Sequence, residues 1–112
     1  MKIAVVGSRD FPDMELVRAF VRSLPKDTVI ISGGARGVDR TAEEEAKKLG
    51  MVTEIYPADW QTHGKKAGFL RNKQMVDAAD RIVAFHDGVS RGTLHTINLA
   101  KAADKPVEIR RI

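Results

Sequence analysis

Five short apolar runs alternate with four helix-favouring stretches along this chain of 112 residues, and no other feature constrains the fold as strongly. The predicted strands are residues 2–6, 28–31, 51–56, 81–85 and 106–109. The predicted helices are residues 16–24, 38–49, 66–79 and 93–103. Strands that alternate with helices pair in parallel through right-handed crossovers, and the helices cover both faces of the sheet. The sequence therefore predicts one α/β domain over residues 1–112, a three-layer, Rossmann-like fold around a five-stranded parallel sheet.

The predicted strands differ in how apolar they are, and this difference predicts their order. Residues 2–6, 28–31 and 82–85 are the most apolar, as is typical of strands buried on both faces. We therefore place these three in the centre of the sheet. The third strand contains Glu54, which favours the sheet edge. Helical spacing gives the first helix a buried face of Leu16, Val17, Phe20, Val21 and Leu24.

Composition excludes several classes of protein. The chain has no cysteine, which excludes structural disulfides and thiolate metal sites. No stretch approaches the roughly 20 apolar residues of a membrane span, so we expect a soluble, cytoplasmic protein with no membrane partner. The three histidines share no spacing that indicates a metal site, and we predict neither a metal nor a cofactor. The net charge of +4 permits an anionic partner but does not require one.

The position of the positive charges is more informative than their number. In a parallel α/β sheet, ligands bind beyond the carboxyl ends of the strands, near the point where strand order reverses. The basic residues predicted at this edge are Arg9, Arg36, Lys65, Lys66, Arg71 and Arg91. The glycines predicted there are Gly7, Gly33, Gly34, Gly37, Gly64, Gly88 and Gly92. Arginine and glycine on one rim indicate a pocket for phosphate.

The segment from Ser32 to Asp39 is the most distinctive part of this rim. Its three glycines stand between a β-branched run and a helix-favouring run, where free N–H groups at a helix start attract anions. The segment matches neither the dinucleotide fingerprint nor the phosphate loop of nucleoside triphosphatases. We therefore disfavour binding of nicotinamide dinucleotides and hydrolysis of ATP or GTP.

Several rim residues have both a structural and a functional interpretation. Ser90 to Thr93 could cap a helix, bind an anion, or do both. As a carboxylate in the first turn of a helix, Asp39 interacts favourably with the helix dipole, which is the structural interpretation. In the functional interpretation it accepts hydrogen bonds from ribose hydroxyls or orients Arg36. Trp60 either stacks on a base or packs at the edge of the core. We expect residues 57–64 to form a polar loop, and residues 43–45, three glutamates, to form a solvated helix face.

Four groups of residues together resemble a known superfamily. They are Val6-Gly7-Ser8-Arg9, the segment Ser32–Asp39, Lys65-x-x-Gly68-x-x-Arg71-Asn72-x-x-Met75, and Asp87-Gly88-x-Ser90-x-Gly92-Thr93. The first two look like paired motifs of the Smf/DprA DNA-processing proteins. The other two resemble the small stand-alone YspA-type (cpYpsA-related) branch of the SLOG superfamily, which joins Smf/DprA with the LOG phosphoribohydrolases. The resemblance covers residues 2–107.

The resemblance implies a nucleotide-binding domain whose ligand lies across the glycine loops. Residues 7–9 would line the pocket floor, the glycines of the second loop and Arg36 would hold phosphate, and residues 92–93 would cradle a second phosphate or the sugar. The expected ligand-binding residues are Gly7, Ser8, Arg9, Ser32, Gly33, Gly34, Arg36, Gly37, Asp39, Lys65, Arg71, Asn72, Asp87, Gly88, Ser90, Gly92 and Thr93.

Two departures from the superfamily leave three hypotheses for function. The LOG enzymes carry a glutamate at the position of Thr96, and without it cleavage of an N-glycosidic bond loses its stabilising carboxylate. Asp39, Asp59 and Asp87 are the candidate substitutes. We also expect no accessory domain of the kind that Smf/DprA carries. We expect a nucleotide sensor or binding module, with a phosphoribohydrolase and a single-stranded nucleic-acid binder as alternatives; the last would stack bases on Trp60 or Phe69. A homodimer is also expected.

Overall fold

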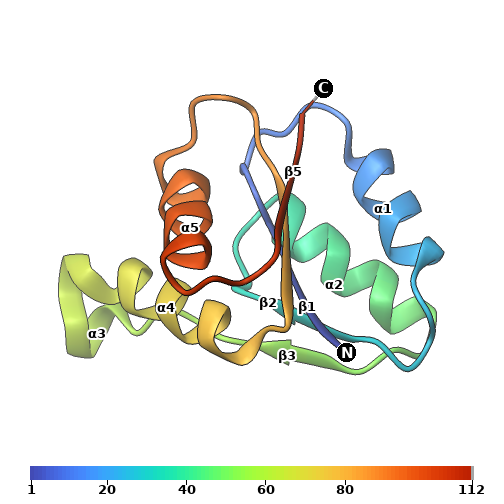
Figure 1. Cartoon of the computed structure of the whole chain (residues 1–112), viewed down its shortest axis with the longest axis horizontal. Coiled ribbons are helices and arrows are strands. Elements are labelled where there is room, and N and C mark those ends of the chain that lie inside the picture. Colours follow the sequence, from blue (N-terminus) through green and yellow to red (C-terminus); the bar gives the residue numbers. More distant parts are fainter. Residues whose placement is uncertain (112) are drawn as a thin grey trace.

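A computed structural model describes residues 1–111 and shows a central sheet between two layers of helices (Figure 1). The strands are β1 (Lys2–Gly7), β2 (Val29–Ser32), β3 (Thr53–Ile55), β4 (Arg81–Phe85) and β5 (Val107–Arg110). The helices are α1 (Met14–Ser23), α2 (Val38–Lys48), α3 (Trp60–His63), α4 (Ala67–Ala78) and α5 (Arg91–Ala102), with a 3₁₀ turn, η1 (Gly64–Lys66), between α3 and α4. The predicted α/β, Rossmann-like fold is confirmed.

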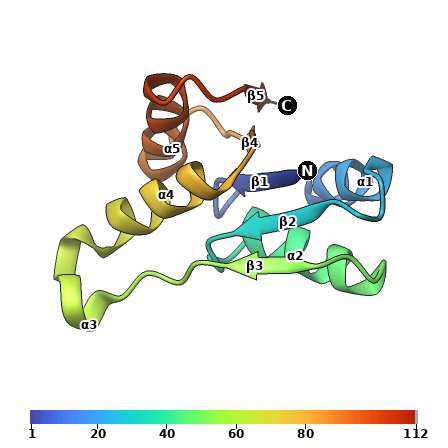
Figure 2. The ribbon, with the colours of Figure 1, turned by 60° about the horizontal axis from the view of Figure 1, so that its bottom comes forward.

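The five strands are all parallel and lie in the order β3-β2-β1-β4-β5 (Figure 2). The three most apolar strands are central and β3 is at an edge, as predicted. Residues 3–7 of β1 pair with residues 81–85 of β4. Strand order reverses between β1 and β4, because the chain runs outward to β2 and β3 on one side and to β5 on the other. This switch point is where such a sheet can bind a ligand.

The sheet buries a separate core on each face. One core packs α1 and α2 against the sheet and contains Val17, Phe20, Val38 and Phe85. The other packs α4 and α5 and contains Met75, Val76, Ile82, Ile97 and Ala100. Because β1 and β4 contribute to both cores, their carboxyl ends are held firmly. The rim beyond them is therefore a rigid support for a site.

Two local predictions were wrong. The segment predicted as a polar loop contains α3, whose first turn is capped because the Asp59 carboxylate accepts a hydrogen bond from the Thr62 N–H at 3.1 Å. This short helix stands away from the sheet, beyond the carboxyl end of β3 (Figure 2). On α1, Leu16 was expected in the core but is 42% exposed. The first helix begins after the cap residue Asp13 and turns Val17, Phe20 and Val21 inward instead.

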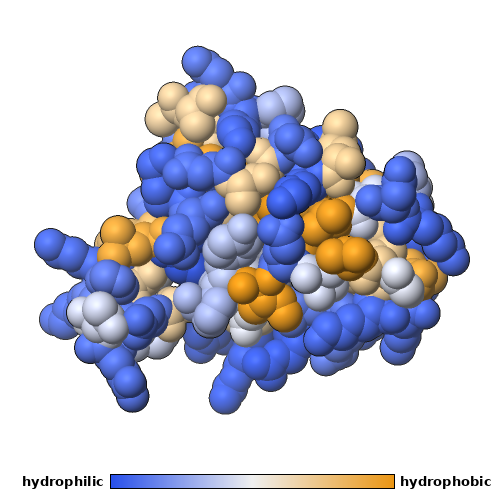
Figure 3. All heavy atoms as spheres, turned by 90° about the horizontal axis from the view of Figure 1, so that it is seen from below, coloured by the Kyte–Doolittle hydropathy of each residue, from blue (hydrophilic) through white to orange (hydrophobic). Residues whose placement is uncertain are grey.

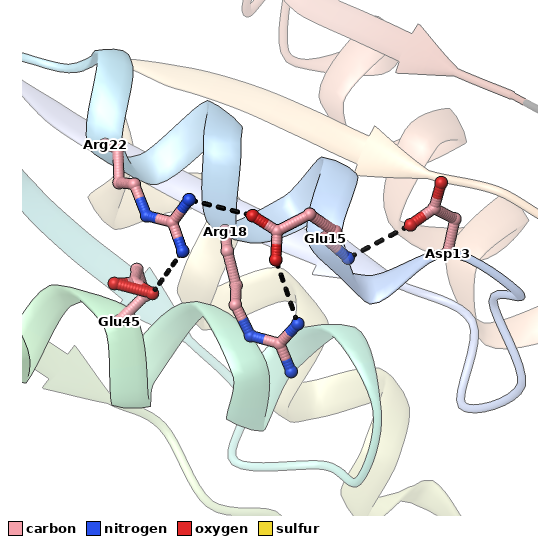
Figure 4. A network of polar contacts seen from close by, with 5 residues as sticks. All are labelled: Asp13, Glu15, Arg18, Arg22 and Glu45. Carbon is pink, nitrogen blue, oxygen red and sulfur yellow. Dashed lines mark hydrogen bonds and ion pairs between the residues drawn. The ribbon is translucent and has the colours of Figure 1, made fainter.

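The three glutamates of α2 are not a uniformly solvated face, which corrects a third prediction. Glu44 is exposed, but Glu43 and Glu45 are 7% and 6% exposed. Glu45 forms an ion pair with Nη2 of Arg22 on α1 at 3.3 Å. Nη1 of the same guanidinium pairs with Glu15 at 2.8 Å (Figure 4). Contacts between α1 and α2 therefore bury Glu45. The composition of α2 alone does not predict these contacts.

None of the helices within residues 1–111 is long and apolar enough to cross a membrane.

Candidate functional site

A cavity of about 490 Å³ lies at the switch point of the sheet. Its walls come from the loops after β1, β2 and β4 and from the inner side of α4 and the first turns of α5. The volume falls within the range of about 300–1,000 Å³ that is typical of small-molecule sites. We call this space the first cavity. The predicted site residues that line it are Gly7, Arg9, Arg36, Asp39, Arg71, Asn72, Asp87, Ser90, Gly92 and Thr93.

Three arginines converge on the first cavity from three elements. Arg9 follows β1, Arg36 follows β2, and Arg71 belongs to α4. Within residues 1–111, none of the three has a carboxylate oxygen within the 4.0 Å of an ion pair. Arg9 and Arg36 are exposed to solvent. Their charges are therefore available to an anion that enters from outside.

Arg71 is held in place by the protein itself. Its Nη1 donates a hydrogen bond to the Gly33 carbonyl at 2.7 Å, and its Nε donates to the Asn72 side chain at 3.0 Å. The Asn72 amide in turn contacts Nδ1 of His95 at 3.1 Å. These bonds fix the guanidinium between α4 and the glycine loop after β2. Arg71 is thus preorganised, which lowers the entropic cost of binding a ligand.

The Asp39 carboxylate is an internal anion of the same loop. Its Oδ2 accepts a hydrogen bond from the Gly33 N–H at 3.2 Å, and the residue is 5% exposed. Burial raises the pKa of Asp39 to about 7, against the opposing effects of Arg71 and of the backbone N–H groups of Ala35 and Gly33. The nearby Glu43 raises this pKa further. The cation that acts on Asp39 is therefore Arg71, in place of the Arg36 suggested by the sequence.

The glycine loop itself is closely packed. The Gly33 N–H is bonded to Asp39, and the Gly34 N–H donates to the Ser32 hydroxyl at 3.2 Å. Gly37 has a φ of +80°, and a Cβ at this position would lie 2.3 Å from the Arg9 carbonyl oxygen. Glycine is required at position 37 for both reasons. The loops after β1 and β2 consequently touch, and this contact brings Arg9 and Arg36 to one rim.

The start of α5 forms the opposite wall of the first cavity. The Ser90 side chain caps the helix, because its Oγ accepts from the Thr93 N–H at 3.4 Å. The Asp87 carboxylate accepts from the N–H groups of Val89 and Ser90, both at 2.9 Å, and these bonds lower the pKa of Asp87. Gly92 faces open space. This wall combines a fixed carboxylate, two hydroxyls and an open helix start.

Thr96 lies in the same wall, at the position where the LOG enzymes carry a glutamate. It is 2% exposed, and its hydroxyl donates to the Gly92 carbonyl at 3.2 Å. The hydroxyl is thus engaged with its own helix, and no carboxylate projects from this position.

A second cavity, of about 500 Å³, adjoins the first, and Arg9, Ala35 and Arg71 line both. It opens between the glycine loop and the chain that leads from β3 into α3. Gly33 and Gly34 are the predicted site residues that line only this space. Trp60 also lines it and is 60% exposed, so it is not a core residue.

Five predicted site residues line neither cavity. Ser8 and Ser32 are buried and support the loops: Ser8 Oγ accepts from the Asp87 N–H at 3.1 Å, and Ser32 Oγ donates to Glu43 at 2.7 Å. Gly37 makes the close approach to Arg9 described above. Gly88 and Lys65 are exposed elsewhere on the rim. Most of the predicted site residues therefore line one of the two cavities, whereas Lys65 lies outside both.

Sequence reasoning missed several lining residues. Asp10, Met75 and Thr96 belong to the first cavity, and Glu43 and Ile55 belong to the second. For Asp10 the signal was available, since it directly follows Arg9 in a rim loop. For Glu43 the only signal was its place one turn after Asp39 on the same helix. Within residues 1–111, no group of three or more His, Asp or Glu side chains is arranged to hold a metal ion.

Comparison with known proteins connects this geometry to a family. Residues 1–63, more than half of the chain, match the model of the YspA, cpYpsA-related SLOG family. The Gene 61 protein of Mycobacterium phage D29 is 40% identical over 116 residues, which cover 95% of this chain and 93% of the phage protein.

Two solved structures share the fold. DNA processing protein A (DprA) from Streptococcus pneumoniae matches with a TM-score of 0.85 and 21% identity, over 96% of this chain and 49% of that one. DNA processing protein A from Helicobacter pylori, described for its single-stranded DNA binding mode, matches with a TM-score of 0.72 and 22% identity, over 97% of this chain and 64% of that one. The chain thus spans roughly half to two thirds of these proteins.

Proposed function

Because the chain belongs to the YspA, cpYpsA-related SLOG family, we propose that it is a binding module for a nucleotide or nucleotide-derived phosphorylated ligand at the carboxyl edge of the sheet. The observation that carries the proposal is the convergence of Arg9, Arg36 and Arg71 on one cavity without carboxylate partners among residues 1–111. Arginine binds phosphate through paired, charge-assisted hydrogen bonds. Such a cluster favours a doubly charged phosphate over a neutral ligand.

The other walls of the first cavity supply the polar groups that a nucleotide needs. The start of α5 adds the positive end of a helix dipole to the phosphate side, and Ser90 and Thr93 add hydroxyl groups. The exposed carboxylate of Asp10 is an acceptor for ribose hydroxyls. Asp39, in contrast, is already bonded to Gly33 and competes with an incoming phosphate for Arg71. We therefore place the phosphate against Arg9 and Arg36 first.

A thermal-shift panel of nucleotides tests this function. A ligand at ten times its Kd is expected to raise the Tm of a domain of this size by roughly 5 °C or more. The variant Arg36→Ala should lose most of this shift. Arg40→Ala is the matched control, because Arg40 is also an exposed arginine but lines neither cavity. If no nucleotide raises the Tm, or if both variants respond as the unmodified protein does, the proposal is wrong.

Single-stranded nucleic acid is the second candidate ligand, and two exposed aromatic side chains favour it. Trp60 and Phe69 are 60% and 56% exposed and lie on α3 and α4, beside the basic rim. Base stacking on such rings, combined with arginine, is how proteins bind single strands without sequence preference. DNA processing protein A from Helicobacter pylori, which shares the fold, binds single-stranded DNA.

Salt dependence separates the two ligands. Binding of an oligonucleotide that neutralises several phosphates should weaken steeply as salt rises, with a slope of about −0.7 per phosphate contacted. A mononucleotide contacts one phosphate group and should show a slope near that of a single contact. A shallow slope with oligonucleotides would reject the nucleic-acid role.

A phosphoribohydrolase activity is the third hypothesis, and the cavity offers Asp39 and Asp87 for it. Both carboxylates are engaged with backbone N–H groups, and Thr96 replaces the expected glutamate. Incubation with nucleoside monophosphates, followed by an assay for the free base, decides it. Release of the free base would show that the protein is an enzyme and not only a binding module.

A further inference from the structure

The two adjoining cavities differ in chemistry, although they share Arg9 and Arg71. The first is lined by three arginines without carboxylate partners among residues 1–111, by three aspartates, by hydroxyls and by a helix start. The second is lined on one side by Ile55, Pro57, Ala58 and Trp60, which supply flat and apolar surface. One space therefore suits an anion and its neighbour suits an aromatic ring. Figure 3 views the molecule from the side of β3 and shows hydrophobic residues as separate patches in a mainly hydrophilic surface.

The second cavity contains one buried carboxylate in addition to its apolar side and to Arg9 and Arg71. Glu43 is 7% exposed, lines this cavity, and accepts a hydrogen bond from the buried Ser32 hydroxyl at 2.7 Å. Within residues 1–111 it forms no ion pair, in contrast to Glu45 two residues further along, which pairs with Arg22. Burying a carboxylate is costly unless it has hydrogen-bond donors. A carboxylate oriented by a single hydroxyl retains further acceptor positions for a ligand.

We propose that the second cavity binds the guanine base of a nucleotide, with Trp60 stacking on the ring and Glu43 accepting hydrogen bonds from its N1–H and 2-amino groups. The inference rests on the proposed function, because the phosphate of the same nucleotide lies in the first cavity. Arg71 stands between the two cavities and would contact the ligand where sugar and phosphate join.

The choice of guanine follows from what a carboxylate can accept. Guanine presents two neighbouring N–H donors, which match the two oxygens of one carboxylate. Adenine and cytosine present one amino group beside a ring nitrogen that is an acceptor and repels the carboxylate. Uracil presents one N–H between two carbonyl oxygens, which are also repelled. Hypoxanthine, the base of IMP, keeps the N1–H of guanine but lacks the 2-amino group. A comparison of GMP with IMP therefore isolates the hydrogen bond from the 2-amino group to the carboxylate.

Trp60 serves both as the stacking surface and as the reporter. It is the only tryptophan of the chain, so the protein's tryptophan fluorescence reports on the surroundings of this one lining residue. Its ring lies near Gly68 of α4, where an added Cβ would be 3.5 Å from the ring. The indole is thus supported on one side and 60% exposed. Base–aromatic stacking is worth about 1–3 kcal/mol by alanine substitution, so it makes a measurable contribution to affinity.

The experiment titrates the intact protein with GMP, IMP, AMP, UMP and ribose 5-phosphate, by calorimetry and by Trp60 fluorescence. We expect GMP to bind about tenfold more tightly than IMP, since one hydrogen bond to a charged group separates them. GMP should quench Trp60, and ribose 5-phosphate should bind without quenching. Trp60→Ala should bring the affinity for GMP close to that for ribose 5-phosphate. Because Trp60 is exposed, this variant does not threaten folding.

Glu43→Gln is the decisive variant, because the glutamine amide oxygen still accepts from Ser32 and its NH₂ group repels the guanine donors. The preference for GMP over IMP should disappear. Glu44→Gln, an exposed neighbour with the same change of charge, should keep it. Equal affinities for GMP and IMP, a preference that survives Glu43→Gln, or nucleotide binding without quenching would overturn the base site and leave the phosphate site intact.

Two further outcomes separate this inference from the function on which it rests. If neither the nucleotides nor ribose 5-phosphate bind, the proposed function fails together with the base site. If a guanine-containing oligonucleotide binds and GMP does not, the cavity serves a nucleic-acid strand and the assignment to a free nucleotide is overturned.

Discussion

Two groups of arginines in this chain are used differently. On α1 and along β4 and β5, each arginine is paired: Arg18 with Glu15, Arg22 with Glu15 and Glu45, and Arg81 and Arg110 with Glu108. At the rim of the sheet, Arg9, Arg36 and Arg71 have no such partner among residues 1–111. The paired group neutralises the protein's own carboxylates. The rim group leaves charge available for another molecule.

One buried carboxylate, that of Asp39, opposes the rim group from within. Asp39 lies in the rim, yet it pairs with backbone N–H groups and acts on Arg71 only through a longer-range attraction. Paired arginines elsewhere lower the pKa of their glutamates, as for Glu15 and Glu108, whereas the pKa of Asp39 is raised. The rim therefore holds a carboxylate whose pKa of about 7 lies near neutral pH, so a change of its ionisation changes how much net positive charge the first cavity offers.

The largest effect is expected from Asp39→Asn. The folded-state pKa of about 7 lies above the usual 3.8, so the folded protein binds more protons than the unfolded chain between these values. Stability should therefore fall as pH rises from about 4 to about 7, by up to roughly 4 kcal/mol. The variant should remove this decrease and bind phosphate ligands more tightly at pH 8. Urea unfolding at pH 5, 6, 7 and 8 measures it; identical pH profiles for both proteins would contradict the prediction.

Arg71→Met is expected to have the next largest effect. It removes the hydrogen bond to the Gly33 carbonyl and the cation that acts on Asp39, at a cost of roughly 2–3 kcal/mol at pH 8. The double variant with Asp39→Asn should recover part of this loss, because the carboxylate that depends on the cation is gone. Denaturant unfolding of the two single variants and the double variant measures this coupling. Additive losses would show that Arg71 and Asp39 act independently.

Arg36→Ala tests the unpaired group directly. It should weaken binding of a phosphorylated ligand about tenfold and leave the Tm of the free protein unchanged within a degree, because Arg36 is exposed and unpaired among residues 1–111. Calorimetric titration and thermal unfolding on the same samples separate the two effects. A loss of stability without a loss of affinity would mean that Arg36 supports the fold, as the paired group does, and does not bind the ligand.

Much of the fold and the rim could be predicted because both follow from local patterns. Apolar runs and helical spacing predict strands and helices, and parallel pairing then places every carboxyl end on one edge. For this reason the sequence already predicts Arg9 and Arg36 at one edge of the sheet. The contact between Gly37 and the Arg9 carbonyl then brings them to one cavity.

The details that failed depend on contacts between distant segments. Glu43 contacts Ser32, which lies 11 residues away, and Glu45 contacts Arg22, which lies 23 residues away. The sequence of the helix alone does not indicate that these two glutamates are buried. The second cavity exists because β3 lies beside β2 and brings residues 55–60 next to the glycine loop. Likewise, the engagement of the Gly33 N–H by Asp39 depends on the turn between them. Such features follow from strand order and loop geometry, which periodicity does not encode.

The smallest effect is expected from Arg22→Ala, which tests the paired group. Arg22 joins Glu15 of its own helix to the buried Glu45 of α2, but its side chain is 48% exposed, so solvent screens both pairs (Figure 4). The Tm should fall by a few degrees at most, and this loss should shrink at high salt. Phosphate binding should be unchanged, in contrast to Arg36→Ala with the same change of charge. A loss of affinity equal to that of Arg36→Ala would mean that net charge, and not the placement of unpaired arginines, draws the anion to this protein.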